Sequence, residues 1–262
     1  VITLVLLLMP VLCLDAISLS IWPVILLVDL LIIGLAVMTG RLMPVLAALV
    51  LTLITAGAWL FRWPREIGFT LMPFLFVIGG FAVLFGIASS FLSRKLPKVA
   101  FSALLPVSSA VLPFLLLILA TLRLQIANPS PVFGLALLLT VFLLGLVRIS
   151  GITALAPTAL GCVLALEWAW HQQSFRVELA TTPLLWYLGF YAIFTAFPLV
   201  FQKQFATRKL PWIASAAAGI GTFSLVYRLI GQTWPNEMMG LLPVAFAIAP
   251  LLCLVFVLKQ HG

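Results

Sequence analysis

The sequence predicts an all-α membrane protein, a polytopic bundle of about ten transmembrane helices, from its composition and its long apolar runs. Apolar residues make up 65% of the 262 residues, charged residues make up 8%, and the mean hydropathy is +1.31. Soluble domains are about half apolar and a quarter charged, and the core of a chain this size could not bury the excess. Lipid is therefore the expected solvent. The apolar runs are continuous, which predicts helices rather than the alternating strands of a membrane barrel.

Ten apolar segments are suited to crossing a bilayer, whose hydrocarbon core takes a helix of about 20 residues. Ser18 to Pro23 must form the turn between the first two segments, and without that turn the chain has nine spans. The predicted spans are residues 1–17, 21–39, 42–61, 71–92, 101–123, 132–148, 152–170, 184–202, 212–231 and 241–259.

The basic residues between these segments predict their orientation, because Lys and Arg gather in short cytoplasmic loops. The loops after even-numbered spans and the tail hold nine basic residues and no acid: Arg41, Arg94, Lys95, Lys98, Arg148, Lys203, Arg208, Lys209 and Lys259. At the opposite ends, five arginines are balanced by five acids: Arg62, Arg65, Arg123, Arg176 and Arg228, with Asp15, Glu66, Glu167, Glu178 and Glu237. We therefore expect a cytoplasmic (inner) membrane protein with both termini of this segment in the cytoplasm. The net charge of +8 is then explained by basic residues that orient the helices in the membrane, and no nucleic-acid partner is expected.

Seven of the eight tryptophans fall near the predicted outer ends, which is typical of an aromatic belt at the headgroup level. They are Trp22, Trp59, Trp63, Trp168, Trp170, Trp186 and Trp234.

A short basic motif occurs twice. It includes Arg94-Lys95-Leu96-Pro97 and Arg208-Lys209-Leu210-Pro211, with Phe and Ala at matching flanking positions and an offset of 114 residues. We interpret it as a cytoplasmic elbow between helices. The proline suits the first turn of the next helix, and the basic pair suits the C-terminal end of the preceding one. Topology alone explains these residues without a ligand.

The elbow predicts parallel repeats of helical hairpins, because four helices separate its two copies. The repeat units are approximately residues 71–148 and 184–259, within a single transmembrane domain over residues 1–262. A weaker third copy follows Thr39 and includes Arg41 and Pro44. Such an array predicts that this chain is a piece of a longer protein, whose remaining helices would be its partners together with the lipid bilayer. The oligomeric state is left open.

Prolines interrupt many of the predicted spans, and Pro113 and Pro198 are the best candidates for kinks in mid-membrane. Discontinuous helices mark binding sites in many transporters, although kinks without a site are more common. The prolines within the predicted spans are Pro10, Pro44, Pro73, Pro106, Pro113, Pro157, Pro198, Pro243 and Pro250.

Asp29 is the acid that the sequence places deepest in a span. A charge at a helix centre costs about 2.5–3.5 kcal/mol on insertion scales. It therefore needs a partner, a watery cavity or a proton. One interpretation is a carboxylate that couples transport to protons or cations, and the other is a neutral acid that hydrogen-bonds a neighbouring helix.

Arg123 and Arg228 lie near the outer ends of corresponding helices, against the inside bias of basic residues. They would bind an anionic headgroup or substrate. Alternatively, they snorkel to the interface or pair with Glu167 or Glu237. Asp29, Arg123 and Arg228 together form the predicted substrate- or ion-binding set.

Glu167 and His171 are four residues apart on one predicted helix and could form an acid–base pair, although an interfacial cap fits them better. No catalytic residue is assigned. His171 and His261 fall on opposite predicted sides of the membrane, so neither a metal site nor a haem or other cofactor is expected. Cys13, Cys162 and Cys253 lie in apolar runs as small buried residues.

Four segments carry a family resemblance: Asn128-Pro-Ser-Pro-Val-Phe-Gly134, Pro183-Leu-Leu-Trp186, Tyr227-Arg-Leu-Ile and Gly240-Leu-Leu-Pro243. Over about the last two-thirds of the chain, the sequence resembles long, many-span predicted bacterial membrane proteins grouped only as a domain of unknown function. The resemblance implies a longer parent chain with more helices. It brings no activity and no functional residues.

Three functions remain open from the sequence. The first is binding or transport of a small or lipid-linked solute, which predicts a polar cavity at mid-depth that contains Asp29. The second is a non-transporting scaffold for envelope assembly, which predicts a dry bundle with an exposed small-residue or aromatic face. The third is an intramembrane enzyme that uses Glu167 and His171, which needs both in a concave outer pocket.

Overall fold

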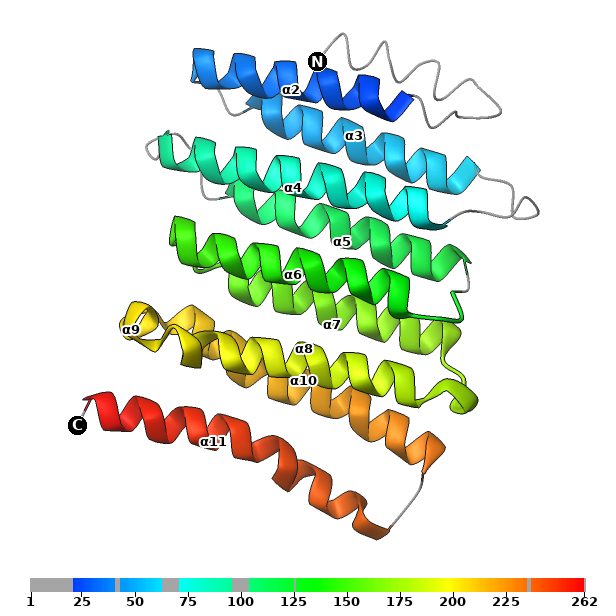
Figure 1. Cartoon of the computed structure of the whole chain (residues 1–262), viewed down its shortest axis with the longest axis vertical. Coiled ribbons are helices and arrows are strands. Elements are labelled where there is room, and N and C mark those ends of the chain that lie inside the picture. Colours follow the sequence, from blue (N-terminus) through cyan, green and yellow to red (C-terminus); the bar gives the residue numbers. More distant parts are fainter. Residues whose placement is uncertain are drawn as a thin grey trace. The chain divides into compact units, whose positions relative to one another are not determined.

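The structure, a computed structural model, describes residues 21–40, 43–62, 71–95, 104–124, 126–234 and 237–261, and these are helical with short connections (Figure 1). The all-α prediction is therefore confirmed for this part of the chain. The helices are α2 (Ile21–Thr39), α3 (Met43–Arg62), α4 (Leu71–Lys95), α5 (Leu104–Leu124), α6 (Ser130–Ser150), α7 (Leu155–Ser174), η1 (Val177–Leu179), α8 (Thr181–Val200), α9 (Gln202–Phe205), α10 (Lys209–Thr233), η2 (Glu237–Leu241) and α11 (Leu242–His261).

Nine of the ten predicted spans correspond to long helices, and the first, residues 1–17, lies outside the described residues. Within the described ranges, seven helices are long and apolar enough to cross a membrane, namely α2 to α6, α8 and α10. The α7 helix is not among them, because its second half carries Glu167, His171 and two glutamines. Seven such helices support a multi-pass membrane protein.

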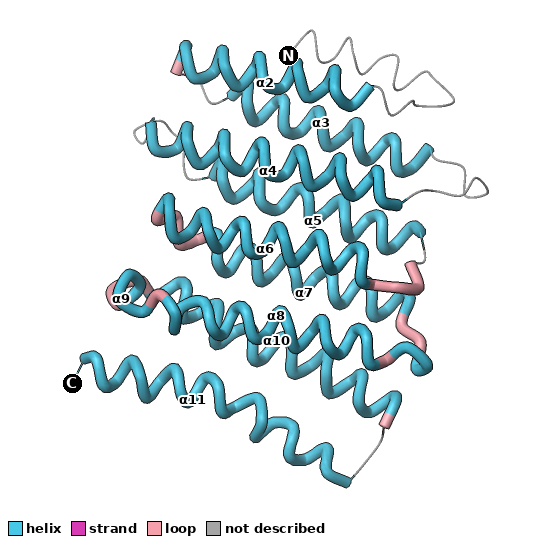
Figure 2. The backbone as a smooth tube through the Cα atoms, viewed as in Figure 1, coloured by secondary structure: helices cyan, strands magenta, loops and turns pink. Residues whose placement is uncertain are grey.

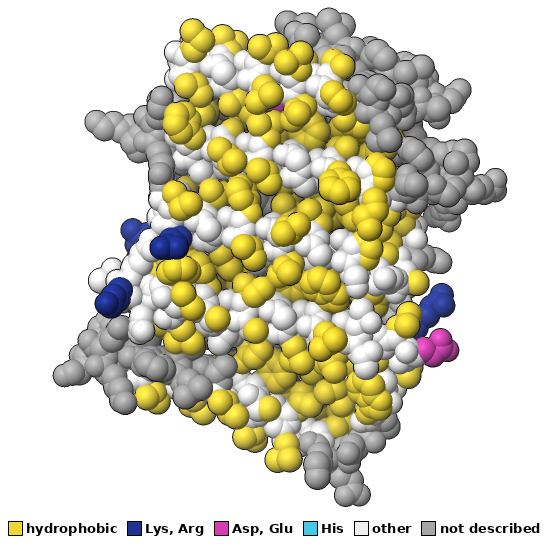
Figure 3. Space-filling view, in the orientation of Figure 1, with side chains coloured by type: hydrophobic (Ala, Val, Ile, Leu, Met, Phe, Trp, Pro, Cys, Tyr) yellow, Lys and Arg dark blue, Asp and Glu magenta, His cyan; other side chains and the backbone are white. Residues whose placement is uncertain are grey.

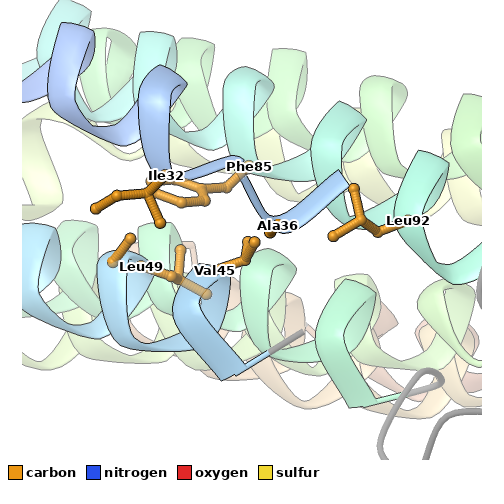
Figure 4. Packing of buried hydrophobic residues seen from close by; sticks show 7 residues of the cluster. Ile32, Ala36, Val45, Leu49, Phe85 and Leu92 are labelled. Atoms are coloured by element: carbon orange, nitrogen blue, oxygen red, sulfur yellow. The ribbon is translucent and has the colours of Figure 1, made fainter. Parts of the chain in front are cut away.

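The chain divides into two compact units, and the first comprises residues 1–124. In this unit, α2 packs against α3 and α4, and α5 packs against α3 and α4. A cluster of buried aliphatic and aromatic side chains joins three of these helices, as Figure 4 shows for Ile32, Ala36, Val45, Leu49, Phe85 and Leu92. At the α2–α3 turn, Gly40 has a positive φ of 66°, the left-handed conformation that ends many helices and favours glycine.

The second unit comprises residues 125–262. Its α6 helix packs against α7 and α8, and its α10 helix packs against α7, α8 and α11. Figure 2 shows that loops join the consecutive helices α6, α7 and α8, with short α9 between α8 and α10. Each long helix of this unit therefore has at least one long neighbour along its length.

Small residues of α10 let its neighbours approach closely. Ser215 and Gly219 are buried, and a Cβ on Gly219 would contact Pro250 and Tyr191. A Cβ on Gly221 would lie 2.4 Å from a methyl group of Leu164. These residues serve packing inside the unit, so they do not form the exposed small-residue face that the scaffold hypothesis predicted.

In the part of the chain that the structure describes, nine helices are long, and each has a proline in its first turn. The first turn of a helix has amides without intrahelical partners, so a proline costs little there. Pro44, Pro73, Pro106, Pro157 and Pro243 therefore begin helices rather than interrupt them. The other first-turn prolines are Pro23, Pro131, Pro183 and Pro211.

Of the two prolines that were predicted to kink a helix in mid-membrane, one lies in the middle of its helix. Pro113 is the tenth of 21 residues in α5, but Pro198 lies only two residues before the end of α8 at Val200. The prediction of a mid-membrane kink at Pro198 is therefore wrong, because the helix ends there before the chain turns into α9.

Large apolar side chains are exposed in both units. Figure 3 shows hydrophobic side chains spread over the drawn face, and several large ones are more than half exposed, including Leu27, Leu31, Phe76, Leu138 and Leu185. Water-exposed surfaces seldom carry this much contiguous apolar area. Lipid is the solvent that suits these faces.

The second elbow differs from the prediction in one respect. Arg208 and Lys209 do not end the incoming helix, because the short helix α9 intervenes; they begin α10, with Pro211 in its first turn. In the first copy, α4 ends with Arg94 and Lys95 as predicted. Their side chains and Pro97 lie outside the described residues.

Gln204 of α9 and Arg208 of the second elbow bind carbonyls at the C-terminal end of α6. The Gln204 amide donates to the Arg148 carbonyl at 2.7 Å, and the Arg208 guanidinium donates to the Gly151 carbonyl at 2.9 Å. Carbonyls at a helix end lack intrahelical donors. The elbow therefore caps α6, a role that its basic charge alone did not indicate.

Replacing Gly151 by Ala is expected to lower the free energy of unfolding by about 1–2 kcal/mol, the cost of left-handed backbone for a residue with a Cβ. Gly151 has φ of 74°, and its Cβ would lie 3.0 Å from the Arg208 guanidinium. Thermal unfolding in detergent, followed by tryptophan fluorescence, measures the loss. Gly189→Ala is the matched control, because a Cβ there meets nothing within 4 Å. An equal effect of both variants would contradict the capping role.

Candidate functional site

Asp29 lies in the middle of α2 and is completely buried. It is the ninth of 19 residues in its helix, with a relative exposure of 0%. The Thr52 hydroxyl, from the middle of α3, donates to its Oδ2 at 2.7 Å. Its Oδ1 is buried and has no hydrogen-bond partner among the described residues. Asp29 thus lies in the middle of its helix, as predicted, and Thr52 is its polar partner.

A small cavity lies beside this pair. Its volume is about 20 Å³, and Thr52 lines it together with apolar residues that include Trp22, Phe81 and Pro113. That volume is sufficient for one water molecule. Thr52 and Pro113 are mid-helix residues, whereas Trp22 lies in the first turn of α2, so the cavity extends from the level of Asp29 toward the start of α2. Asp29 does not itself line the cavity, whose lining apart from Thr52 is apolar, so the prediction of a polar cavity that contains Asp29 is wrong for the described residues.

The predicted aromatic belt is wrong for three tryptophans. Trp22, Trp59 and Trp170 have relative exposures of 4%, 2% and 0%. Trp22 and Trp59 pack together with ring centroids 5.1 Å apart, and the Trp170 indole donates to the Ile126 carbonyl at 2.8 Å. These rings lie near helix ends but point inward, where they are buried among the helices.

Arg123 lies in the last turn of α5, and its guanidinium lies 5.0 Å from the ring centroid of Phe61 on α3. This is a cation–π geometry. Asp29 has no hydrogen bond or ion pair with Arg123 in the part of the chain that the structure describes.

The second unit contains a buried group of polar side chains, Glu167 and His171 of α7 with Tyr187 of α8. Their relative exposures are 1%, 5% and 0%. The Tyr187 hydroxyl lies 3.3 Å from His171 Nδ1, and the histidine ring stacks on Phe175 with centroids 4.6 Å apart. Neither carboxyl oxygen of Glu167 has a hydrogen-bond partner in the described residues. The interpretation of Glu167 as an interfacial cap is therefore wrong.

Glu167 and His171 do not form the acid–base pair of the enzyme hypothesis. No hydrogen bond joins them in the described chain, and His171 faces Tyr187 instead. Nor do three metal-ligating side chains lie close enough together to hold a metal ion within the described ranges.

Arg228 is exposed on α10, with its guanidinium 5.4 Å from the ring centroid of Trp168. The described residues show no ion pair between Arg228 and the buried carboxyl of Glu167. The alternative of an arginine that snorkels beside an aromatic ring suits this geometry. Asp29 and Arg123 belong to the first unit and Arg228 to the second, so neither unit alone holds the whole predicted set.

Thr52 and Tyr187 were not among the predicted site residues, although the sequence carries a signal for both. Asp29 lies eleven residues before Gly40, and Thr52 lies twelve residues after it. His171 and Tyr187 each lie eight residues from Leu179, in the turn between α7 and α8. Two antiparallel helices place residues equidistant from their turn at the same level. Polar residues at such positions therefore predict pairs.

Comparison with known proteins gives no assignment: no family model, no curated protein and no solved structure matches this chain.

Proposed function

We propose that the protein binds or transports a small or lipid-linked solute across a bacterial inner membrane, with Asp29 as the carboxyl that carries a coupling proton. The observation that supports this most is the buried Asp29–Thr52 pair at the centre of two apolar helices. A carboxyl at such a depth is costly and usually functional. Neighbouring Pro113 lacks the amide that would complete the α5 hydrogen-bond ladder, which suits a helix that changes shape.

A proton fits Asp29 better than a metal cation. Hard cations such as Ca²⁺ or Mg²⁺ take six or more oxygen ligands, whereas Thr52 supplies the one hydroxyl that contacts Asp29 in the described residues. The nearby cavity is otherwise lined mainly by aliphatic and aromatic groups. A proton needs no such ligand shell, and it would leave Asp29 as a neutral hydrogen-bonding group.

The proposal includes the topology that the charge pattern predicts. It places both termini of this segment in the cytoplasm, counts ten spans and treats the elbow motif as the boundary of repeated hairpins. It also includes the resemblance to many-span bacterial membrane proteins. The consecutive pairing of α2 with α3 and of α4 with α5 supports hairpins as building units of the first unit.

Asp29→Asn is expected to abolish protein-dependent proton flux. Purified protein would be reconstituted into liposomes that contain a pH-sensitive dye, and a potassium diffusion potential with valinomycin would drive protons inward. The wild-type protein should conduct protons faster than protein-free liposomes, and the Asn variant should match the protein-free rate. Thr52→Val should reduce the flux without abolishing it, because it removes one hydrogen bond.

Glu178→Gln is the matched control, because Glu178 is an exposed acid in η1. It should conduct like the wild type. Asn has nearly the shape of Asp and still accepts the Thr52 bond, so equal elution volumes and unfolding temperatures would show that the variant folds. Equal flux in the wild type and in folded Asp29→Asn would refute the role of Asp29.

A further inference from the structure

A groove of about 350 Å³ lies between α6 and α8 of the second unit. Val141, Leu144 and Gly145 line it from α6, and Ile193 and Phe197 line it from α8. This volume falls in the range of small-molecule sites, about 300–1,000 Å³. Its walls are apolar along the direction of two candidate spanning helices. An apolar chain that runs parallel to these helices suits such a groove.

One charged residue lines the groove, and it lies at one end. Arg148 occupies the last turn of α6, is exposed, and holds its guanidinium 4.4 Å from the ring centroid of Phe201, which follows α8. The Gln204 bond to its backbone carbonyl fixes the helix end beneath it. The positive charge of Arg148 therefore has a defined position at one end of the apolar groove.

Arg148 has no acidic partner among the described residues. The acids whose side chains are described in this unit are Glu167 and Glu178. Glu167 is buried in α7, and Glu178 lies in the turn between α7 and α8, at the end of the unit opposite to Arg148. Lys203 of α9 and Lys209 at the start of α10 are exposed at the same end of the unit as Arg148. In Figure 3, basic side chains lie without acidic neighbours at the end where α6 stops and α9 lies. The groove therefore ends in an unbalanced positive charge.

We propose that this groove binds an anionic phospholipid, with an acyl chain between α6 and α8 and the phosphate on Arg148. Basic pockets between transmembrane helices bind anionic headgroups, and arginine presents a planar fork of donors that matches phosphate oxygens. The charge pattern predicts that this end faces the cytoplasmic leaflet, which carries the anionic lipids. The proposal does not depend on Asp29, which lies in the other unit.

Gly145 makes the groove testable without disturbing its walls. A Cβ at Gly145 meets nothing within 4 Å, so a larger side chain enters the groove and not a neighbouring helix. Gly145→Leu is therefore expected to fill the groove while leaving Arg148 in place. Gly161→Leu in α7 is the matched control, because its Cβ also meets nothing within 4 Å and it does not line the groove.

The test is lipid retention by purified protein in detergent, measured by native mass spectrometry. The probes are phosphatidylglycerol and phosphatidylcholine with identical acyl chains, and glycerol 3-phosphate as a headgroup without a chain. The wild type and Gly161→Leu should retain phosphatidylglycerol about fivefold better than phosphatidylcholine, as expected for one basic residue at a membrane surface. Arg148→Gln should remove this preference, and Gly145→Leu should remove the most tightly retained lipid of either kind.

Several outcomes would overturn the proposal. These are an unchanged preference in Arg148→Gln, lipid retention by Gly145→Leu equal to that of the wild type, or displacement of phosphatidylglycerol by glycerol 3-phosphate. A dimer in gel filtration that Gly145→Leu dissociates would instead assign the groove to a second copy of the chain. Arg176→Gln, at the other end of the unit, controls for charge. Asp29→Asn should retain lipid normally, which separates this proposal from the proton-coupling one.

Discussion

Replacing Glu167 by Met is expected to stabilise the protein by about 1–3 kcal/mol, the usual cost of a buried polar group without hydrogen bonds. The Glu167 side chain is 1% exposed, and neither of its oxygens has a partner in the described residues. Methionine has a similar volume and adapts to irregular packing. The gain corresponds to roughly 2–4 °C per kcal/mol in the unfolding temperature for a chain of this size, measured by tryptophan fluorescence in detergent.

Two further variants define what the result means. Glu178→Met removes an exposed acid and should change stability by less than about 0.5 kcal/mol. Glu167→Gln keeps a polar group in the same place and should gain less than the methionine variant. Destabilisation by Glu167→Met would contradict the expectation, because it would show that the carboxyl makes favourable interactions in the folded protein.

A stabilising substitution would also bear on function. Proteins keep residues that break local rules mainly at functional sites. If Glu167→Met raises stability and lowers the proton flux described above, then the buried Glu167, His171 and Tyr187 group takes part in proton movement. If stability rises and flux is unchanged, the carboxyl has no role in that activity.

Phe133→Ala is expected to destabilise the second unit by about 3–5 kcal/mol, the typical loss for deleting a fully buried aromatic ring. Phe133 is 0% exposed, and its ring centroid lies 5.8–6.3 Å from the centroids of four aromatic residues. These residues are Trp170 of α7 and Trp186, Tyr187 and Phe190 of α8. Removing the ring leaves a cavity at the junction of three helices, which surrounding groups fill incompletely.

Leu138→Ala provides the control for this prediction on the same helix. Leu138 is 68% exposed, so its side chain faces the surrounding lipid or detergent and deleting it opens no cavity. Thermal unfolding should separate the two variants clearly. Similar unfolding temperatures for both would show that the aromatic group contributes little to the stability of the unit.

The helix positions were predicted well from the sequence, because particular residue types mark the helix ends. The predicted span 21–39 coincides with α2, which ends at a glycine with positive φ, and the span 42–61 differs from α3 by one residue at each end. Glycine, proline and charged residues mark these ends regardless of tertiary structure. The short helix α9 was missed, because four residues carry too little periodicity to predict a helix.

The direction in which side chains point was harder to predict. Glu167 was expected with His171 in a cap at the membrane interface, yet it points into the unit. In a soluble helix the polar face indicates which side meets solvent. In α7 Glu167 and His171 are buried, so polarity does not distinguish the lipid side from the protein side. The exposed residues of α7 are Gly161, Ala165, Gln172 and Gln173. Asp29 and Thr52 lie at nearly equal distances from the turn between their helices. Such positions indicate which polar residues face each other, which hydrophobic periodicity does not show.

The prolines that open the nine long helices have a consequence for how such a chain can vary. A helix whose first turn is set by proline begins at the same residue whatever precedes it. Loops can then gain or lose residues without changing the rotation of the next helix about its axis. In a membrane, where that rotation decides which side chains meet lipid, connections can diverge in length while each helix keeps its orientation.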